Sequence, residues 1–177
     1  IEESYCTGDK SGSEKFDKWA ETVPYTLRNP LYHWTHLELQ RYFDVNDILN
    51  PGSAKKIYDE CTKKLQTKEY SVRNLLRKMD VKVVCTTDDP TDTLEHHQKI
   101  KEDGFEITIL PAFRPDKAMN TDHADSFNAY IKKLENVSGI SVISYRSYLD
   151  ALKQRHDFFA SMGCSVSDHG VEYIFAE

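Results

Sequence analysis

The sequence predicts an α/β protein with parallel strands, preceded by a mostly helical segment. Two observations predict this class. Apolar residues in the first part of the chain recur at helical spacing, and from Val81 onward short β-branched runs alternate with helical stretches. Strands that alternate with helices form parallel sheets with crossover connections. We therefore divide the chain into a mostly helical segment, 1–80, and a segment of strand–helix units, 81–177.

The helical segment is expected to hold three helices joined by turns. Residues 1–14 are polar and are expected to form a loose lead-in. The first helix is predicted over Leu31–Phe43, directly after an Asn-Pro pair. The second follows the Asn-Pro-Gly turn at 50–52, with Ser53 as its cap, and the third begins at Ser71.

Three strands are predicted in the second segment, over 81–87, 105–113 and 164–167. The first is β-branched and largely apolar, which predicts a strand buried on both faces. Asp92 and Glu95 predict a capping box for the helix after it. Two further helices are expected, one through 127–134 and one over 145–162. Three parallel strands leave open edges, so the sheet is expected to continue into a doubly wound sheet or a barrel.

Composition limits the classes of partner. The chain has 177 residues, of which 39% are hydrophobic, and no apolar run approaches the ~20 residues that span a bilayer. A net charge of −6 disfavours nucleic acid, because phosphate binding needs a basic surface. The four cysteines are scattered and form no C-x-x-C pair, which predicts reduced thiols and a cytoplasmic location.

Charged residues begin where each predicted strand ends, and they are Asp88 and Asp89, then Arg114, Asp116 and Lys117, then Asp168 and His169. Ligands of parallel α/β proteins bind at that edge of the sheet. A charged residue at one strand end can equally belong to an ordinary turn. The repetition at three strand ends favours a binding site for a small anion.

Arg114 is the strongest single candidate, because its guanidinium fork matches a carboxylate or a phosphate. A salt bridge to Asp116 or to a neighbouring loop is the structural alternative. Asp168 and His169 form a candidate acid/base pair, but adjacent residues of an extended segment point to opposite faces. Only one of them is therefore expected to face the site.

Metal ligands are not predicted from the residues themselves. His33 and His36 lie three apart on a helix, but two imidazoles without a third ligand are weak evidence for zinc. The sequence holds no H-x-H after a strand and no H-E-x-x-H. The residues alone thus indicate an anion site and no particular reaction.

Several stretches are informative when taken together, and in chain order they are KWAETVP at 18–24, NPLYHWTHLEL at 29–39, SVRNL at 71–75, VCTTDDP at 84–90, LEHH at 94–97, FRPDK at 113–117 and SDHG at 167–170. They resemble the uronate isomerase family of the amidohydrolase superfamily, in the family's order and over nearly the whole chain. The resemblance implies a partial (β/α)8 TIM barrel. The three strands then correspond to the second, third and fourth of the barrel, and 1–80 to an insertion before them.

The activity that the resemblance implies is aldose–ketose isomerisation of a sugar acid. It interconverts D-glucuronate with D-fructuronate and D-galacturonate with D-tagaturonate in bacterial uronate catabolism. By the same resemblance Arg114 holds the substrate carboxylate or an oxygen that gains charge, and Asp168 binds sugar hydroxyls or helps to move protons. Asp89, His33 and Trp34 lie in family-like stretches without an assigned role, and His169 is a further candidate.

The family's divalent metal, zinc or manganese, is held by residues that the resemblance implies lie outside this chain, namely an H-x-H, an aspartate and a further histidine. We therefore expect an internal piece of an isomerase, without a metal of its own and without turnover by itself. Two alternatives stay open. One is a sugar-acid-binding or structural half barrel that pairs with another copy as a homo-oligomer. The other is a related amidohydrolase-type enzyme acting on another sugar acid.

Overall fold

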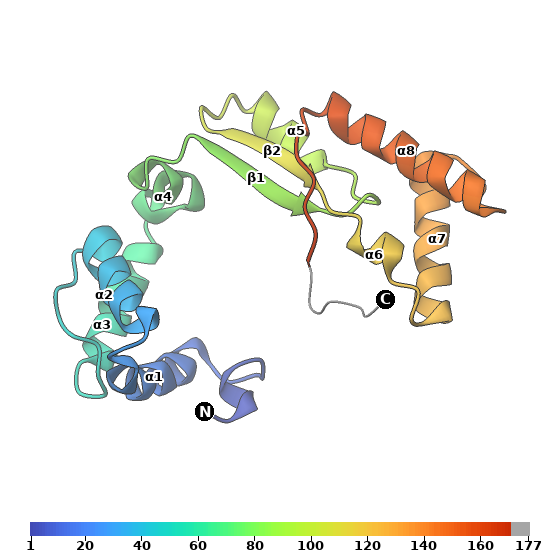
Figure 1. Ribbon diagram of the computed structural model, residues 1–177. Helices are drawn as coiled ribbons and strands as arrows, with labels where there is room; N and C mark the ends of the chain where they lie inside the picture. The colour runs from blue at the N-terminus through green and yellow to red at the C-terminus, as the bar shows by residue number, and fades with distance from the viewer. Residues whose placement is uncertain (171–177) are drawn as a thin grey trace. The chain divides into compact units, whose positions relative to one another are not determined.

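The structure is a computed structural model that describes residues 1–170, and it contains two compact units (Figure 1). The first unit is Ile1–Val81 and is helical, and the second runs from Lys82 onward and mixes strands with helices. The α/β class predicted from the sequence is confirmed. Within the described part of the chain no helix is long and apolar enough to cross a membrane.

The first unit contains four α-helices and three short 3-10 turns among its described residues. The helices are α1 (Gly12–Thr22), α2 (Pro30–Phe43), α3 (Ala54–Leu65) and α4 (Val72–Lys78). The 3-10 turns are Glu3–Tyr5, Val23–Thr26 and Lys68–Tyr70. The three predicted helices are confirmed as α2, α3 and α4.

Helix α1 shows that the expectation of a loose lead-in over 1–14 was wrong. Ser11 caps the helix by accepting from the Glu14 N–H at 3.3 Å, and the Glu14 carboxylate accepts in return from the Ser11 N–H at 3.0 Å. This reciprocal capping box satisfies two backbone donors and begins a helix inside a stretch of polar composition.

The core of the first unit lies between α1, α2 and α3. Its buried residues are Ala20, Val23, Leu39, Val45, Leu49, Ala54 and Ile57. His36 helps to close it, because its Nε2 accepts from the Leu49 N–H at 3.0 Å and its Nδ1–H donates to the Tyr32 carbonyl at 2.6 Å. His36 is thus a satisfied structural histidine.

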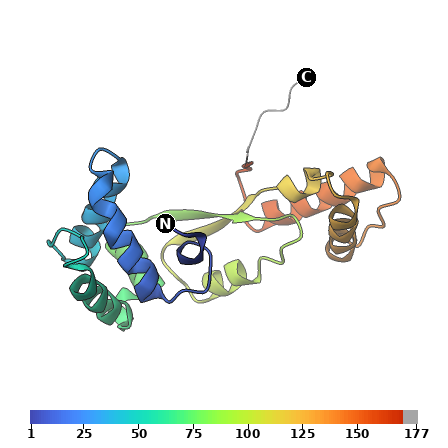
Figure 2. The same cartoon turned by 90° about the horizontal axis from the view of Figure 1, so that it is seen from below.

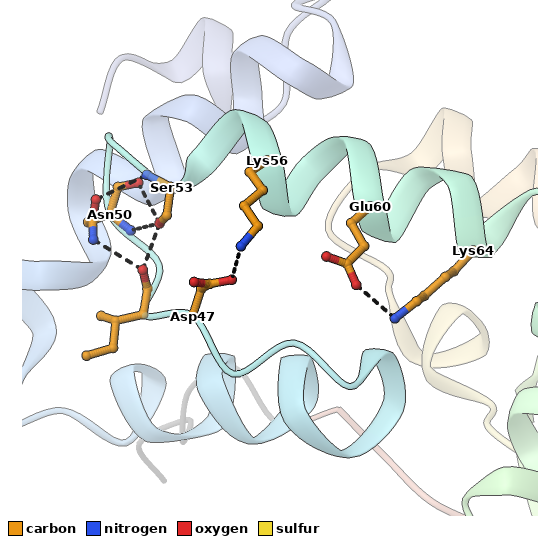
Figure 3. A network of polar contacts seen from close by, with 7 residues as sticks. Asp47, Asn50, Ser53, Lys56, Glu60 and Lys64 are labelled. Atoms are coloured by element: carbon orange, nitrogen blue, oxygen red, sulfur yellow. Dashed lines mark hydrogen bonds and ion pairs between the residues drawn. The ribbon is translucent and has the colours of Figure 1, made fainter.

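Ser53 occupies the predicted position before α3, but its side chain makes no cap bond to the helix. Its hydroxyl instead accepts from the Asn50 N–H at 3.0 Å and donates to the Ile48 carbonyl at 2.7 Å. Figure 3 shows this turn together with ion pairs made by Lys56 and Lys64 of α3. The serine hydroxyl therefore closes the turn and not the helix end.

The second unit is built on two parallel strands, β1 (Val83–Asp88) and β2 (Thr108–Phe113), paired from Val83 with Thr108 to Asp88 with Phe113. Its described helices are α5 (Glu95–Glu102), α6 (Asp116–Met119), α7 (Ala124–Ser138) and α8 (Tyr145–Ser161). Helix α5 crosses over between the strands, and Figure 2 shows it on one face of them. Parallel pairing with a helical crossover is what the sequence predicted.

Strand β1 is not buried on both faces, contrary to the prediction. Its residues alternate between exposed and half-buried, with Val84, Thr86 and Asp88 on the half-buried side. Val83 is 54% exposed on the opposite side. Within the described residues, one face of this strand is therefore covered and the other is open.

The third predicted strand, over 164–167, forms a single parallel bridge, between Ser167 and Phe113. Two hydrogen bonds support the bridge, from the Phe113 N–H to the Val166 carbonyl at 3.1 Å and from the Asp168 N–H to the Phe113 carbonyl at 3.3 Å. The segment therefore lies beside β2, as a neighbouring strand would. This contact brings residues 114 and 168 together.

The predicted capping box at Asp92 and Glu95 is absent. Leu94 is the cap residue of α5, with a left-handed backbone and no side-chain cap bond, and Asp92 instead accepts from the Asp89 N–H at 2.8 Å. Gly104 follows the helix with φ of 65°, as predicted for its end. Asp92 therefore stabilises the loop that follows β1.

Candidate functional site

The charged residues that follow β2 and the 164–167 segment come together at one edge. The parallel bridge between Phe113 and Ser167 places the next residue of each segment side by side. Arg114 Nη2 donates to Asp168 Oδ2, and the Arg114 N–H donates to the Asp88 carbonyl at 2.9 Å. The guanidinium is thus mounted on β1 and β2 together and paired with the candidate aspartate.

Asp116 binds the same segment from the first turn of α6. Its Oδ1 lies 2.8 Å from His169 Nδ1, and its Oδ2 accepts from the Gly170 N–H at 2.7 Å. Arg114 Nε lies 3.9 Å from Asp116 Oδ2. Asp168 and His169 therefore both contact the segment after β2, and the expectation that only one of them faces a binding site stays a prediction.

The structural alternative foreseen for Arg114 is present, since its guanidinium pairs with Asp168 and lies 3.9 Å from Asp116, and its role in binding an anion stays a prediction. The hydrogen bond that Arg114 donates to Asp168 is the main cause that raises the pKa of Arg114, and the negative charges of Asp168 and Asp116 raise it further. The hydrogen bond from the Gly170 N–H is the main cause that lowers the pKa of Asp116, and the contact with His169 lowers it further. Arg114 Nε and Asp168 Oδ1 are buried atoms without a hydrogen-bond partner. These two atoms are buried beside the Arg114–Asp168 pair, and their hydrogen-bonding capacity is unused within the described residues.

Asp89 is held inside its own loop. Its side chain is 10% exposed, and its Oδ1 accepts from the Thr91 N–H at 2.9 Å and from the Thr91 hydroxyl at 2.7 Å. Lys117 Nζ lies 3.9 Å from Asp89 Oδ2. Burial is the main cause that raises the pKa of Tyr148 to about 12, and the nearby charge of Asp89 adds to it. The same two causes raise the pKa of Tyr130. This environment is typical of a carboxylate that stabilises a loop.

His33 and Trp34 lie on α2 in the first unit, and both are exposed. Trp34 is 57% exposed and lines a largely apolar groove of about 280 Å³ together with Trp19 and Leu31. The described structure assigns His33 no hydrogen bond or ion pair. These two candidates therefore gain no chemical role from the geometry of their own unit.

Arg155 was missed in the sequence. It is 5% exposed on α8, and its guanidinium donates to the carbonyls of Pro90 at 2.8 Å, Asp92 at 2.9 Å and Val137 at 3.2 Å. His156, the next residue on the same helix, is exposed. The burial of Arg155 could have been found from the helical spacing, because Ala151 and Phe159, four residues before and after it, lie on the same buried face of the helix.

His97 of α5 is held against the end of β1. Its side chain is 10% exposed and its Nε2 lies 2.7 Å from the Thr86 hydroxyl, which donates to Asp88 Oδ2 at 2.6 Å. Hydrogen bonds thus connect His97 through Thr86 to Asp88, and His97 Nδ1 is left without a partner. These residues fasten α5 to the strand end.

The donor set at the strand-end edge does not fit a metal ion. Among residues 1–170 no three His, Cys, Asp or Glu side chains are placed to hold one. Asp168 and Asp116 gather with His169, but the Arg114 guanidinium already pairs with the first carboxylate and lies 3.9 Å from the second. A fixed cation stands where a divalent ion would have to bind.

Comparison with known proteins agrees with the resemblance seen in the sequence. A family model described as glucuronate isomerase matches residues 1–177. Curated relatives include the uronate isomerases of Phocaeicola vulgatus, 56% identical over 178 aligned residues, and Bacteroides thetaiotaomicron, 55% identical over the same length. Each comparison covers 100% of this chain and 38% of the relative, so the chain spans well under half of their length.

Solved structures show the same similarity. The crystal structure of uronate isomerase from Thermotoga maritima superposes with a TM-score of 0.88 at 40% identity, covering 96% of this chain and 37% of that one. Glucuronate isomerase from Caulobacter crescentus superposes with a TM-score of 0.84 at 26% identity, covering 91% and 33%. With a family model matched from end to end, the chain belongs to the glucuronate isomerase family.

Proposed function

We propose that this chain supplies the carboxylate-binding part of an aldose–ketose isomerase acting on D-glucuronate and D-galacturonate, with D-fructuronate and D-tagaturonate as the products. The names of the relatives support the class of substrate. The observation that carries the proposal is the mounting of Arg114, whose guanidinium lies at the strand-end edge and pairs there with Asp168.

The fold proposal follows the same comparison. We propose that β1, β2 and the 164–167 segment correspond to the second, third and fourth strands of a (β/α)8 barrel. The open face of β1 supports this assignment, because the inward face of a barrel strand is covered by the other strands. The strand-end edge that carries Arg114 would then be the edge at which such barrels bind their ligands.

In the proposed chemistry the two residues have separate tasks. A uronate carries a permanent carboxylate, and the Arg114 guanidinium offers a rigid fork that matches it. The Asp168 side chain is partly exposed beside Arg114, and its carboxylate would accept from a sugar hydroxyl or carry a proton between neighbouring positions. Isomerisation needs no external oxidant, since the hydrogen lost at one carbon is returned at the next.

The test is a titration of the 177-residue chain with a sugar acid. Binding is monitored through the NMR chemical shifts of the Arg114 side chain. D-galacturonate is expected to bind and D-galactose, which lacks the carboxylate, is not. Arg114→Lys keeps the charge and loses the fork, so uronate binding should weaken about tenfold, equivalent to ~1.4 kcal/mol. Arg146→Lys, at an exposed pair on α8, is the matched control and should leave the affinity unchanged.

Equal binding of the sugar and the sugar acid, or an unchanged affinity in Arg114→Lys, would remove Arg114 from the site.

A second proposal concerns turnover by the chain itself. Because residues 1–170 provide no three-ligand set for a metal, we propose that the chain binds uronates without isomerising them. Added zinc or manganese should not restore activity, and conversion at a rate near that of a complete uronate isomerase would contradict this.

We also propose a cytoplasmic location and a small-molecule substrate, with no nucleic-acid partner. The net charge of −6 and the four free thiols support these assignments.

A further inference from the structure

We propose that Asp116 is a positioning residue of this site, which holds His169 and Gly170 so that the Asp168 carboxylate meets Arg114 and His169 presents its Nε2 as a proton acceptor. This inference rests on the proposed function, because it names a further residue of the same site. It is carried by the contacts of one carboxylate to two successive residues of the 168–170 segment.

The first step is the way in which the 168–170 segment is attached. The bridge to β2 ends at Ser167, and the Asp168 N–H makes the last of its hydrogen bonds, at 3.3 Å. Beyond that point the Asp116 carboxylate holds the segment, because Oδ1 contacts His169 Nδ1 and Oδ2 accepts from the Gly170 N–H. Asp116 therefore fixes the two residues that follow Asp168, and with them the direction from which Asp168 reaches Arg114.

The second step is the close approach at Gly170. A Cβ at this position would lie 3.2 Å from Asp116 Oδ2 and 4.0 Å from Arg114 Nη1. A side chain would crowd the carboxylate that the backbone N–H binds at 2.7 Å. The absence of a side chain at 170 is thus matched to the Asp116 contact.

The third step is the protonation of His169. Donation from the Gly170 N–H and from His169 lowers the pKa of Asp116, so its carboxylate is ionised near neutral pH and can only accept hydrogen bonds. The proton shared at 2.8 Å must then reside on His169 Nδ1. In the neutral imidazole the lone pair is consequently on Nε2, and the tautomer is set by the partner of the other nitrogen.

The charged groups around His169 carry one positive and two negative charges, which favours a positive charge on its ring. Arg114 carries a positive charge, Asp116 and Asp168 carry negative charges, and His169 is 48% exposed at its side chain. A proton accepted at Nε2 from one hydroxyl of the sugar would leave that oxygen with the electron pair of the broken O–H bond and form an imidazolium that Asp116 stabilises directly. Its return to a neighbouring oxygen of the sugar would restore the neutral ring, so no group is consumed.

The experiment uses the 177-residue chain labelled with ¹⁵N, and it assigns the His169 tautomer from long-range nitrogen–proton correlations at about pH 8.5, where imidazole is neutral. Wild-type His169 should be the Nδ1–H tautomer. In Asp116→Ala it should change to Nε2–H, the Gly170 amide should exchange about tenfold faster, and D-galacturonate should bind about tenfold more weakly.

Two further variants keep the test decisive. Gly170→Ala retains the charge of Asp116 but crowds it, and it should weaken uronate binding in the same way. Asp122→Ala removes an exposed aspartate between α6 and α7 and should leave the tautomer, the amide exchange and the affinity unchanged.

An Nε2–H tautomer in the wild type would overturn the inference, as would wild-type uronate affinity in Asp116→Ala. If the tautomer and the amide exchange respond to Asp116→Ala while the wild type binds no uronate, the positioning role stands and the proposed function fails. The two failures are therefore distinguishable.

Discussion

At the scale of single residues, the site is a set of oppositely charged side chains in contact with one another. Arg114 pairs with Asp168, and Asp116 lies between Arg114 and His169. Such partly exposed pairs contribute little to stability in water, where salt and solvent screen them. Their value lies in orientation, because each side chain is directed by a partner on another segment.

The acid stability of the chain should depend measurably on Asp116. Its pKa is lowered in the folded state, chiefly by the Gly170 N–H. A carboxylate of this kind stabilises the fold fully above its ordinary pKa of about 3.9, and the effect is lost as the pH falls through the lower, folded value. Asp116→Asn should therefore unfold at less urea than the wild type at pH 6.

The difference between the two urea midpoints should shrink as the pH is lowered from about 5 toward 2. Asp122→Asn is the matched control for the loss of one negative charge. A difference between wild type and Asp116→Asn that stays constant with pH would show that the Asp116 carboxylate is not stabilised by its contacts.

At the scale of elements, the parallel strands and their crossover could be predicted and the details of their edges could not. The β-branched run of β1 and the helical stripe of α8 are local patterns that a sequence displays directly. Burial on both faces of β1 was wrong because burial depends on neighbours that a local pattern does not specify. The alternation of β1 is a property of this chain's packing.

The candidate site illustrates the same limit. Arg114 and Asp168 were identified because both follow a strand, and the bridge to Ser167 brings them into contact. The contacts of Asp116 with the 168–170 segment could not be predicted, because they depend on the Gly170 N–H, which is 54 residues away in the sequence. Arg155 was missed since a charged residue on an apolar stripe is assigned to solvent unless its partners are known.

Arg155 should be the most sensitive position of α8. Its guanidinium is buried and donates to the carbonyls of Pro90 and Asp92, which form the loop after β1, and it stacks on Phe158 with its centre 4.2 Å from the ring. Arg155→Met fills the space but leaves those carbonyls unpaired, and we expect a loss of ~3 kcal/mol in the free energy of unfolding.

Urea unfolding followed by circular dichroism measures this loss. Arg146→Met, on the same helix with a side chain that is 85% exposed, is the matched control and should change the free energy of unfolding by less than about 0.5 kcal/mol. A loss below about 1 kcal/mol in Arg155→Met would mean that water replaces the guanidinium without strain.

At the scale of the whole molecule, the chain separates its apolar core from its charged site. The first unit, Ile1–Val81, has its own core between α1, α2 and α3. In the second unit, Phe159 and Phe113 form one buried cluster and Leu134 with Ala151 another. Each unit therefore has the buried apolar contacts that a separately folding segment needs.

Binding of uronates should consequently reside in the second unit. Arg114, Asp116 and Asp168 all belong to it, and their contacts are made within it. We expect residues 82–177, expressed alone, to give dispersed NMR spectra and to bind D-galacturonate within about threefold of the 177-residue chain, a difference of ~0.6 kcal/mol. Residues 1–81 alone should fold and bind no uronate.

His33 and Trp34 provide the second arm of this test. Both are exposed on α2, so alanine at either position removes a side chain without disturbing the core of the first unit. In the 177-residue chain, His33→Ala and Trp34→Ala should each leave the affinity for D-galacturonate unchanged, while Arg114→Ala abolishes measurable binding. Loss of affinity in His33→Ala or Trp34→Ala, or in residues 82–177 when these are folded, would show that the first unit contributes directly to the sugar-acid site.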